Sequence, residues 1–210
     1  MIRILITDDH AIVRRGLKDI LADEFPGANF GEAQNAVELL RQLRQQTWDI
    51  VILDITMPGR SGLDVLKDVK HEHPKLPVLV LTVHPEDQYA VRVLKAGANG
   101  FMNKESAPEE LVKAVNRLLQ GGRYVSPSLA EKLAFDLRAE TMEAPHEKLS
   151  DREYQVLCMI ASGKTVSQIA EDLSLSVKTI STHRVRLLAK MNMKTNAELT
   201  RYAIQNRLVG

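Results

Sequence analysis

Residues 49–62 read DIVILDITMPGRSG, and this stretch decides the fold class. Its first part, DIVIL at residues 49–53, is an almost continuous apolar run that ends at Asp54. Such a run predicts a strand buried on both faces, as in parallel sheets. Residues 61–72 then have the apolar spacing of a helix, and Ser61 or Gly62 is the expected N-cap of this helix. The stretch is therefore one strand followed by one helix, with an acid at the carboxyl end of the strand.

The same order of strand and helix recurs on both sides of this stretch. We expect further strands at residues 2–7, 29–33, 76–81 and 100–102, and further helices at 10–23, 35–46, 86–95 and 107–120. Five units of this kind predict an α/β fold, a doubly wound five-stranded parallel sheet with helices on both faces. In such sheets, ligands bind outside the carboxyl ends of the strands.

Reactive side chains follow those strand ends. Asp8 and Asp9 come after the first strand, Asp54 after the third, Thr82 at the end of the fourth and Lys104 after the fifth. Three crowded carboxylates repel one another unless a cation joins them, and Mg²⁺ prefers oxygen ligands. The Asp54 carboxylate can then accept a phosphoryl group, whose oxygens Lys104 and Thr82 would bind. One acid at a strand end most often caps a helix or solvates a loop, but the five residues together favour a phosphoryl site.

Composition limits the class of protein. The chain has 210 residues, 44% hydrophobic and 26% charged, which is typical of one large or two small globular domains. A single cysteine excludes an intramolecular disulfide framework and a cysteine-rich zinc site. No apolar stretch approaches the roughly 20 residues of a membrane-spanning helix, and the N-terminus does not resemble a signal peptide. We therefore expect a cytoplasmic protein with no membrane partner.

Charge divides the chain into two modules. Residues 1–124 carry 16 Lys and Arg against 17 Asp and Glu, whereas residues 147–210 carry 10 against 6. A near-neutral first module and a basic second module indicate that the second one meets a polyanion. Residues 124–146 are interpreted as a linker with a short helix at 127–140 and a flexible segment at 141–147.

The second module has an all-helical pattern. Four helices are expected, at residues 151–162, 165–173, 177–191 and 196–206. Ser150 and Glu153 have the spacing of a capping box at the first of them. The second and third helices are short, joined by a tight connection, and the third is basic, so that the pair resembles a helix-turn-helix.

A helical wheel assigns the faces of the third helix. With Ile180 inward, Val177 and Leu187 also fall on the packed side. The outward and flanking residues mix cations, which suit phosphates, with short side chains, which suit base edges. The resulting DNA-contact candidates are Lys178, Ser181, Thr182, Val185, Arg186 and Lys190.

Both modules resemble known families. The segments ILITDDH at 4–10, VILDITMPGRSG at 51–62, LTVH at 81–84 and GANGFMNK at 97–104 resemble a receiver domain over residues 1–123. Residues 149–199, LSDREYQVLCMIASGKTVSQIAEDLSLSVKTISTHRVRLLAKMNMKTNAEL, are similar to the LuxR-type DNA-binding domain over residues 147–210. In combination the chain resembles a NarL/FixJ-class two-component response regulator.

The resemblance implies a function. Asp54 would accept a phosphoryl group from a sensor histidine kinase, and Thr82 and Phe101 would form the switch pair that reports it. Mg²⁺ would be bound by Asp9 directly, by Asp8 through water, by an Asp54 oxygen and by the backbone carbonyl of Thr56. Phosphorylation would favour a homodimer on double-stranded promoter DNA, because a two-fold dimer doubles the contacts with a near-palindromic site.

Two alternatives remain open at this stage. A phosphatase or phosphotransferase would use Asp54 as a turnover nucleophile, but a haloacid-dehalogenase-like enzyme needs an acid where this chain has Thr56. The phosphate-binding loop GxxxxGK[ST] of nucleotide hydrolases is absent as well. A regulator that binds DNA without phosphate control is the other alternative. The expected function is a transcription regulator and not an enzyme.

Overall fold

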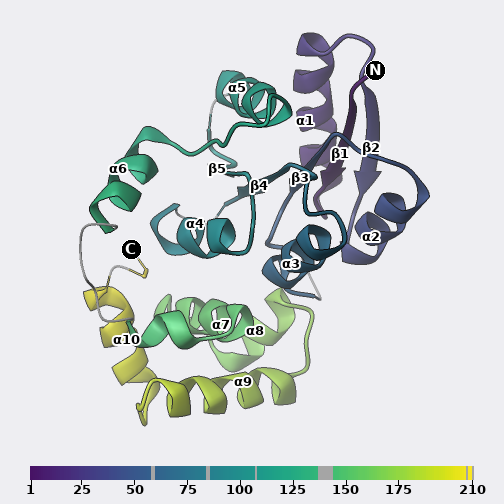
Figure 1. Ribbon diagram of the computed structural model, residues 1–210. Helices are drawn as coiled ribbons and strands as arrows, with labels where there is room; N and C mark the ends of the chain where they lie inside the picture. Colours follow the sequence, from purple (N-terminus) through teal and green to yellow (C-terminus); the bar gives the residue numbers. More distant parts are fainter. Residues whose placement is uncertain (58–59, 84–85, 107, 137–143, 207, 210) are drawn as a thin grey trace. The chain divides into compact units, whose positions relative to one another are not determined.

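Figure 1 shows a computed structural model of the chain, which describes residues 1–57, 60–83, 86–106, 108–136, 144–206 and 208–209. The chain divides into two compact units, Met1–Leu133 and Ala134–Gly210. The boundary between the units falls within one helix, and each unit is described by itself.

The first unit contains the predicted parallel sheet (Figure 1). Its five strands are β1 (Arg3–Thr7), β2 (Asn29–Ala33), β3 (Ile50–Leu53), β4 (Val78–Thr82) and β5 (Gly100–Asn103). They pair in the order β2-β1-β3-β4-β5, and every pair is parallel. The strand order reverses between β1 and β3, because β2 lies on one side of β1 while β3, β4 and β5 follow on the other side. The carboxyl ends of β1 and β3 therefore form the crevice in which such sheets bind ligands. The α/β prediction is confirmed.

Helices cover both faces of this sheet. They are α1 (Ala11–Glu24), α2 (Ala36–Gln45), α3 (Gly62–Glu72), α4 (Glu86–Lys95) and α5 (Pro108–Leu119). Helix α6 (Pro127–Asp136) follows them in the chain. Side chains alternate along a strand, so Ile4 and Ile6 of β1 pack with Leu21 of α1 and Leu118 of α5 in one buried cluster. Helices α2 and α3 contact each other and not this cluster. Strands β1, β3, β4 and β5 are buried along most of their length, as their solid apolar runs predicted, whereas in the edge strand β2 only Ala33 is buried.

The segment after α5 stays attached to the sheet. Tyr124 forms a parallel bridge with Gly100, and its carbonyl accepts a hydrogen bond from the Phe101 N–H at 3.1 Å. Helix α6 begins where Ser126 Oγ accepts the Leu129 N–H at 3.1 Å, and it is described as far as Asp136. Residues 137–140 of the expected helix lie outside the described residues. Of the segment expected to be flexible, residues 141–143 lie outside the described residues. Pro145–Lys148 form the 3₁₀ helix η1, a correction to that expectation.

The second unit is all helical. It contains α7 (Asp151–Ala161), α8 (Val166–Asp172), α9 (Val177–Lys190) and α10 (Asn196–Gln205). Helix α7 contacts the other three, and its core side chains include Tyr154 and Leu157, both almost fully buried. The predicted capping box of Ser150 and Glu153 is present at the start of α7. The turn between α8 and α9 passes through Ser174, whose φ of 51° is a left-handed conformation rare outside glycine.

Candidate functional site

The carboxyl edge of the sheet brings the predicted acids together. Asp54 follows β3, and its N–H donates to the Thr7 carbonyl at the end of β1 at 2.8 Å. Asp8 follows Thr7, and its N–H donates to the Ala33 carbonyl of β2 at 3.1 Å. The side chains of Asp8 and Asp54 are only 2% and 1% exposed. The strand ladder thus fixes two buried carboxylates side by side.

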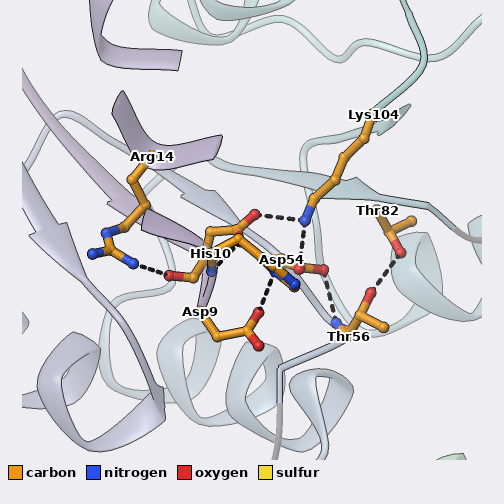
Figure 2. A network of polar contacts seen from close by, with 8 residues as sticks. Asp9, His10, Arg14, Asp54, Thr56, Thr82 and Lys104 are labelled. Carbon is orange, nitrogen blue, oxygen red and sulfur yellow. Dashed lines mark hydrogen bonds and ion pairs between the residues drawn. The ribbon is translucent and has the colours of Figure 1, made fainter. Parts of the chain in front are cut away.

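Lys104 lies between these two carboxylates (Figure 2). Its N–H donates to the Thr82 carbonyl at 2.9 Å, and its Nζ lies 2.5 Å from Asp8 Oδ2 and 2.6 Å from Asp54 Oδ2. Burial alone would lower the pKa of Lys104, but the charges of Asp54 and Asp8 and the hydrogen bonds to them raise this pKa above its ordinary value. Lys104 is therefore a firmly charged ammonium that neutralises part of the acidic cluster.

Asp9 supplies the oxygen that best fits a metal ion. Its Oδ1 is buried, and among the described residues it accepts no well-formed hydrogen bond, although the His10 Nδ1 lies 3.0 Å away. Ligand atoms of Asp8, Asp9, His10 and Asp54 all lie within 4.8 Å of one another. Carboxylate oxygens gathered in this way fit the ligand set of Mg²⁺, which usually takes one or two carboxylates and keeps several waters.

His10 belongs to this cluster and was missed by the sequence analysis. Its Nδ1 lies 3.0 Å from Asp9 Oδ1 and 3.3 Å from Asp8 Oδ1, and its backbone N–H donates to Asp8 Oδ1 at 2.9 Å. The signal was present in the sequence, because His10 directly follows the two aspartates and precedes the first helix.

The two threonines meet beside Asp54. The Thr56 N–H donates to Asp54 Oδ1 at 2.8 Å, and the hydroxyls of Thr56 and Thr82 lie 3.1 Å apart (Figure 2). Thr82, the last residue of β4, is fully buried. Phe101 lies on the neighbouring strand β5 and is fully buried as well. The predicted pair of Thr82 and Phe101 thus lies within the core of the first unit, with the Thr82 hydroxyl close to the acidic cluster.

A second candidate site lies on α9. Lys178, Thr182, Val185 and Arg186 are exposed, and Ser181 is half-buried beside them. Val185 is 62% exposed, so its apolar side chain is available to a partner on this face. The helical wheel was wrong for Val177, which is the first residue of α9 and is 51% exposed.

Two cationic residues of α9 are paired within the second unit, and a histidine of the same helix carries no charge at neutral pH. Lys190 Nζ lies 2.7 Å from Glu153 Oε2, a partner that the sequence analysis did not predict. Arg184 Nε donates to Asn196 Oδ1 at 2.6 Å. Burial, followed by the charge of Arg152, lowers the pKa of His183, so this imidazole adds no cation to the face at pH 7. The free positive charge of the face therefore comes mainly from Lys178 and Arg186.

Comparison with known families accounts for both sites. Residues 4–116 match the response regulator receiver domain, and residues 147–203 match the bacterial regulatory proteins of the luxR family. The chain is a response regulator with a LuxR-type DNA-binding domain. This membership confirms the resemblance to the NarL/FixJ class and makes the protein a DNA-binding transcription regulator rather than an enzyme.

Relatives match this response regulator over its whole length. It is 35% identical to response regulator UvrY of Escherichia coli over 209 residues, which are 99% of this chain and 96% of UvrY. It is 36% identical to response regulator GacA of Pseudomonas viridiflava over 210 residues, 100% of this chain and 98% of GacA.

Solved structures show the same architecture. RcsB of Salmonella enterica serovar Typhimurium, bound to promoter rprA in the presence of the phosphomimetic BeF₃⁻, matches with a TM-score of 0.64 and 29% identity over 96% of this chain and 98% of RcsB. A second RcsB–DNA complex matches with a TM-score of 0.59 and 28% identity over 100% and 99% of the two chains. Among the helices that the structure describes, none has both the length and the apolar character needed to span a bilayer.

Proposed function

We propose that this response regulator is switched by phosphorylation of Asp54 and that the phosphorylated form binds promoter DNA as a homodimer. One observation carries the proposal, the convergence of Lys104 and Thr56 on the buried Asp54 carboxylate beside the acidic cluster. A sensor histidine kinase is the expected donor. The receiver would span residues 1–123, the linker 124–146 and the DNA-binding domain 147–210. Since promoter DNA lies in the bacterial cytoplasm, the proposal puts the protein there.

The transfer makes one bond and breaks another. An Asp54 carboxylate oxygen bonds to phosphorus, and the phosphorus–nitrogen bond of the kinase phosphohistidine breaks, with its electron pair left on the histidine. Asp9, Asp8, Asp54 and the Thr56 carbonyl would hold Mg²⁺. That ion, when bound, supplies positive charge against the carboxylates and the phosphoryl oxygens.

Lys104 and Thr82 would then hold the new phosphoryl group. Lys104 Nζ already contacts Asp54 Oδ2, so a small movement of its ammonium would replace this contact with one to the phosphoryl oxygens. The Thr82 hydroxyl, now 3.1 Å from that of Thr56, would turn its donor to the same oxygens. We propose that this turn, together with the packing of Phe101, reports phosphorylation.

The face of α9 would read the DNA. Lys178 and Arg186 would contact phosphates, with a smaller contribution from Lys190 because Glu153 already compensates its charge. Ser181, Thr182 and Val185 would meet base edges in the major groove, since their side chains are short and lie on one side of the helix.

A binding series on genomic promoter fragments tests the proposal. Wild type and Asp54→Asn are titrated with and without Mg²⁺ and acetyl phosphate, a small phosphoryl donor. The proposal predicts that the donor tightens binding of the wild type and leaves Asp54→Asn unchanged. Equal affinity of the wild type with and without the donor, on fragments that it does bind, would favour a regulator without phosphate control.

A further inference from the structure

Arg14 is a nearly buried cation behind the acidic cluster, on the first turns of α1. Its side chain is only 13% exposed. Its Nη1 donates to the backbone carbonyl of Asp8 at 2.8 Å, and its Nε donates to Glu32 Oε2 of β2 at 3.2 Å. Figure 2 shows the guanidinium beside the cluster, with its dashed line running to that carbonyl and not to a carboxylate.

The carbonyl that Arg14 holds belongs to the peptide group between Asp8 and Asp9. A peptide group is planar, so the direction of this carbonyl also sets the direction of the Asp9 N–H and the position of the Asp9 Cα. The Asp8 N–H is fixed separately by the Ala33 carbonyl of β2. Arg14 is therefore the side chain that fixes the plane between the two acids.

Glu32 in turn fixes Arg14. Glu32 directly precedes Ala33 in β2, so the same strand holds the Asp8 N–H through its backbone and the Asp8 carbonyl through the Glu32–Arg14 pair. A planar guanidinium bonds both partners at once because its N–H groups point in fixed directions.

We propose that Arg14 is a positioning residue for Mg²⁺, which orients Asp8 and Asp9 through the peptide between them. The inference rests on the proposed function, because it assigns Mg²⁺ to this pair. Partners that orient metal ligands from behind typically contribute about 10–100-fold in metal affinity.

Electrostatics predicts the opposite sign, which makes the inference testable. A cation near a metal site repels the metal, so removing Arg14 would tighten Mg²⁺ binding if charge were its only effect. Positioning predicts weaker binding after the same removal. Arg15 provides a matched control, since it is the next residue on α1, carries the same charge and has an 85% exposed side chain.

The experiment measures Mg²⁺ binding to the full-length chain by titration calorimetry, for wild type, Arg14→Met, Arg14→Lys and Arg15→Met. We expect Arg14→Met to bind about tenfold more weakly. Arg14→Lys should fall between this variant and the wild type, because one ammonium reaches the carbonyl without also holding Glu32. Arg15→Met should bind as the wild type does. Thermal unfolding without Mg²⁺ separates positioning from loss of structure.

The outcomes separate this inference from the proposed function. Weaker Mg²⁺ binding by Arg14→Met at an unchanged unfolding midpoint supports positioning, while equal or tighter binding overturns it alone. Failure of the wild type to bind Mg²⁺ would overturn the proposed function and this inference with it. If Arg14→Met does not fold, Arg14→Lys decides by the same criterion, because it keeps the charge and the length of the side chain.

Discussion

The ammonium of Lys104 contacts two buried carboxylates at once, and this contact determines how positive charge is shared among the acids of the site. Asp8 and Asp54 each contact the Lys104 ammonium, whereas Asp9 Oδ1, among the described residues, accepts no well-formed hydrogen bond and has only the His10 imidazole beside it, with Nδ1 at 3.0 Å. The remaining demand for positive charge is therefore concentrated on Asp9. An incoming divalent ion gains most at this residue.

Asp9→Ala tests this distribution of charge. The substitution removes the carboxylate that, in the described part of the chain, lies beside neither Lys104 nor another ammonium, so Mg²⁺ affinity should fall by at least about tenfold while the fold persists. Titration calorimetry measures the affinity. Asp19→Ala, which removes an exposed acid of α1, is the control and should leave the affinity unchanged. Unaltered affinity in Asp9→Ala would remove Asp9 from the site.

Sequence reasoning located the reactive residues better than their contacts. Asp8, Asp54 and Lys104 could be predicted together, because parallel strands end at one edge of a sheet. The bridge that Lys104 makes to both acids depends on a side-chain conformation and could not be predicted. Arg14 was missed because it reaches the site through the Asp8 backbone carbonyl, which leaves no trace in the pattern of side chains, and its other partner, Glu32, is 18 residues away in the sequence.

At the scale of elements, the start of α7 and the end of α9 are joined through Glu153. Its Oε2 accepts the Ser150 N–H at 2.8 Å in the capping box and lies 2.7 Å from Lys190 Nζ. Burial would raise the pKa of Glu153, but the bonds to Lys190 and Ser150 outweigh burial and lower this pKa below its ordinary value. One carboxylate thus caps one helix and fixes another.

Glu153→Gln should destabilise the protein by about 1–2 kcal/mol at neutral pH, because the amide keeps a capping acceptor but loses the charge that Lys190 needs. Since the folded pKa lies below the unfolded one, the contribution is complete above the ordinary Glu value of 4.5 and is lost as the pH falls through the folded pKa. Denaturant unfolding at several pH values should show the difference from wild type shrinking in acid. A difference that grows in acid, or one equal to that of the exposed Glu171→Gln, would contradict the assignment.

The ion pair of Lys190 with Glu153 means that Lys190 and Lys178, both on α9, should contribute differently to DNA binding. Lys178→Ala should weaken binding to all DNA sequences and lower the log–log salt slope by about one unit per monomer. Lys190→Ala should lower the slope less and should reduce the free energy of unfolding, because its main partner is Glu153. Binding to target and scrambled DNA at several salt concentrations measures the slopes. Equal slopes for the two variants, with unchanged stability for Lys190→Ala, would contradict this division.

Element boundaries and faces were predictable to different degrees. The four helices of the second unit could be predicted from their caps and from the spacing of apolar residues. Thr165 and Gln168 form a capping box at α8, in which Gln168 takes the place that a Glu can also take. A helical wheel gives the side of the helix but not how far along it the packing extends, so it assigned Val177, the exposed first residue of α9, to the packed side. The Lys190–Glu153 pair joins residues 37 apart in sequence and has no local signal.

At the scale of the whole molecule, Tyr124, the first residue of the proposed linker, is hydrogen-bonded to the backbone at β5 of the sheet. The Tyr124 carbonyl accepts the Phe101 N–H, and the Tyr124 N–H donates to the Asn99 carbonyl at 3.0 Å. A rearrangement of the proposed switch pair would therefore reach the linker through main-chain bonds of β5. The sequence predicted two modules from charge and motifs and placed the start of the linker at Tyr124. It carried no signal that Tyr124 is hydrogen-bonded to the sheet.

Phosphorylation should shift the chain from monomer toward dimer. The exposed face of α9 is one short helix, and a two-fold pair doubles the contacts with a palindromic site. Sedimentation of the wild type with Mg²⁺, with and without the phosphomimetic BeF₃⁻, measures the change in mass, and Asp54→Asn is the control that should not respond. Identical masses at concentrations that support DNA binding would contradict the dimer.

The most direct test of the central claim is to locate the phosphoryl group. The full-length chain is incubated with Mg²⁺ and acetyl phosphate, and intact-protein and peptide mass spectrometry count and map the groups added. The proposed function predicts one phosphoryl group per chain, on the peptide that contains Asp54, and none on Asp54→Asn, whose amide is nearly isosteric with the carboxylate. Undiminished labelling of Asp54→Asn, or labelling of the wild type at another residue, would contradict Asp54 as the acceptor.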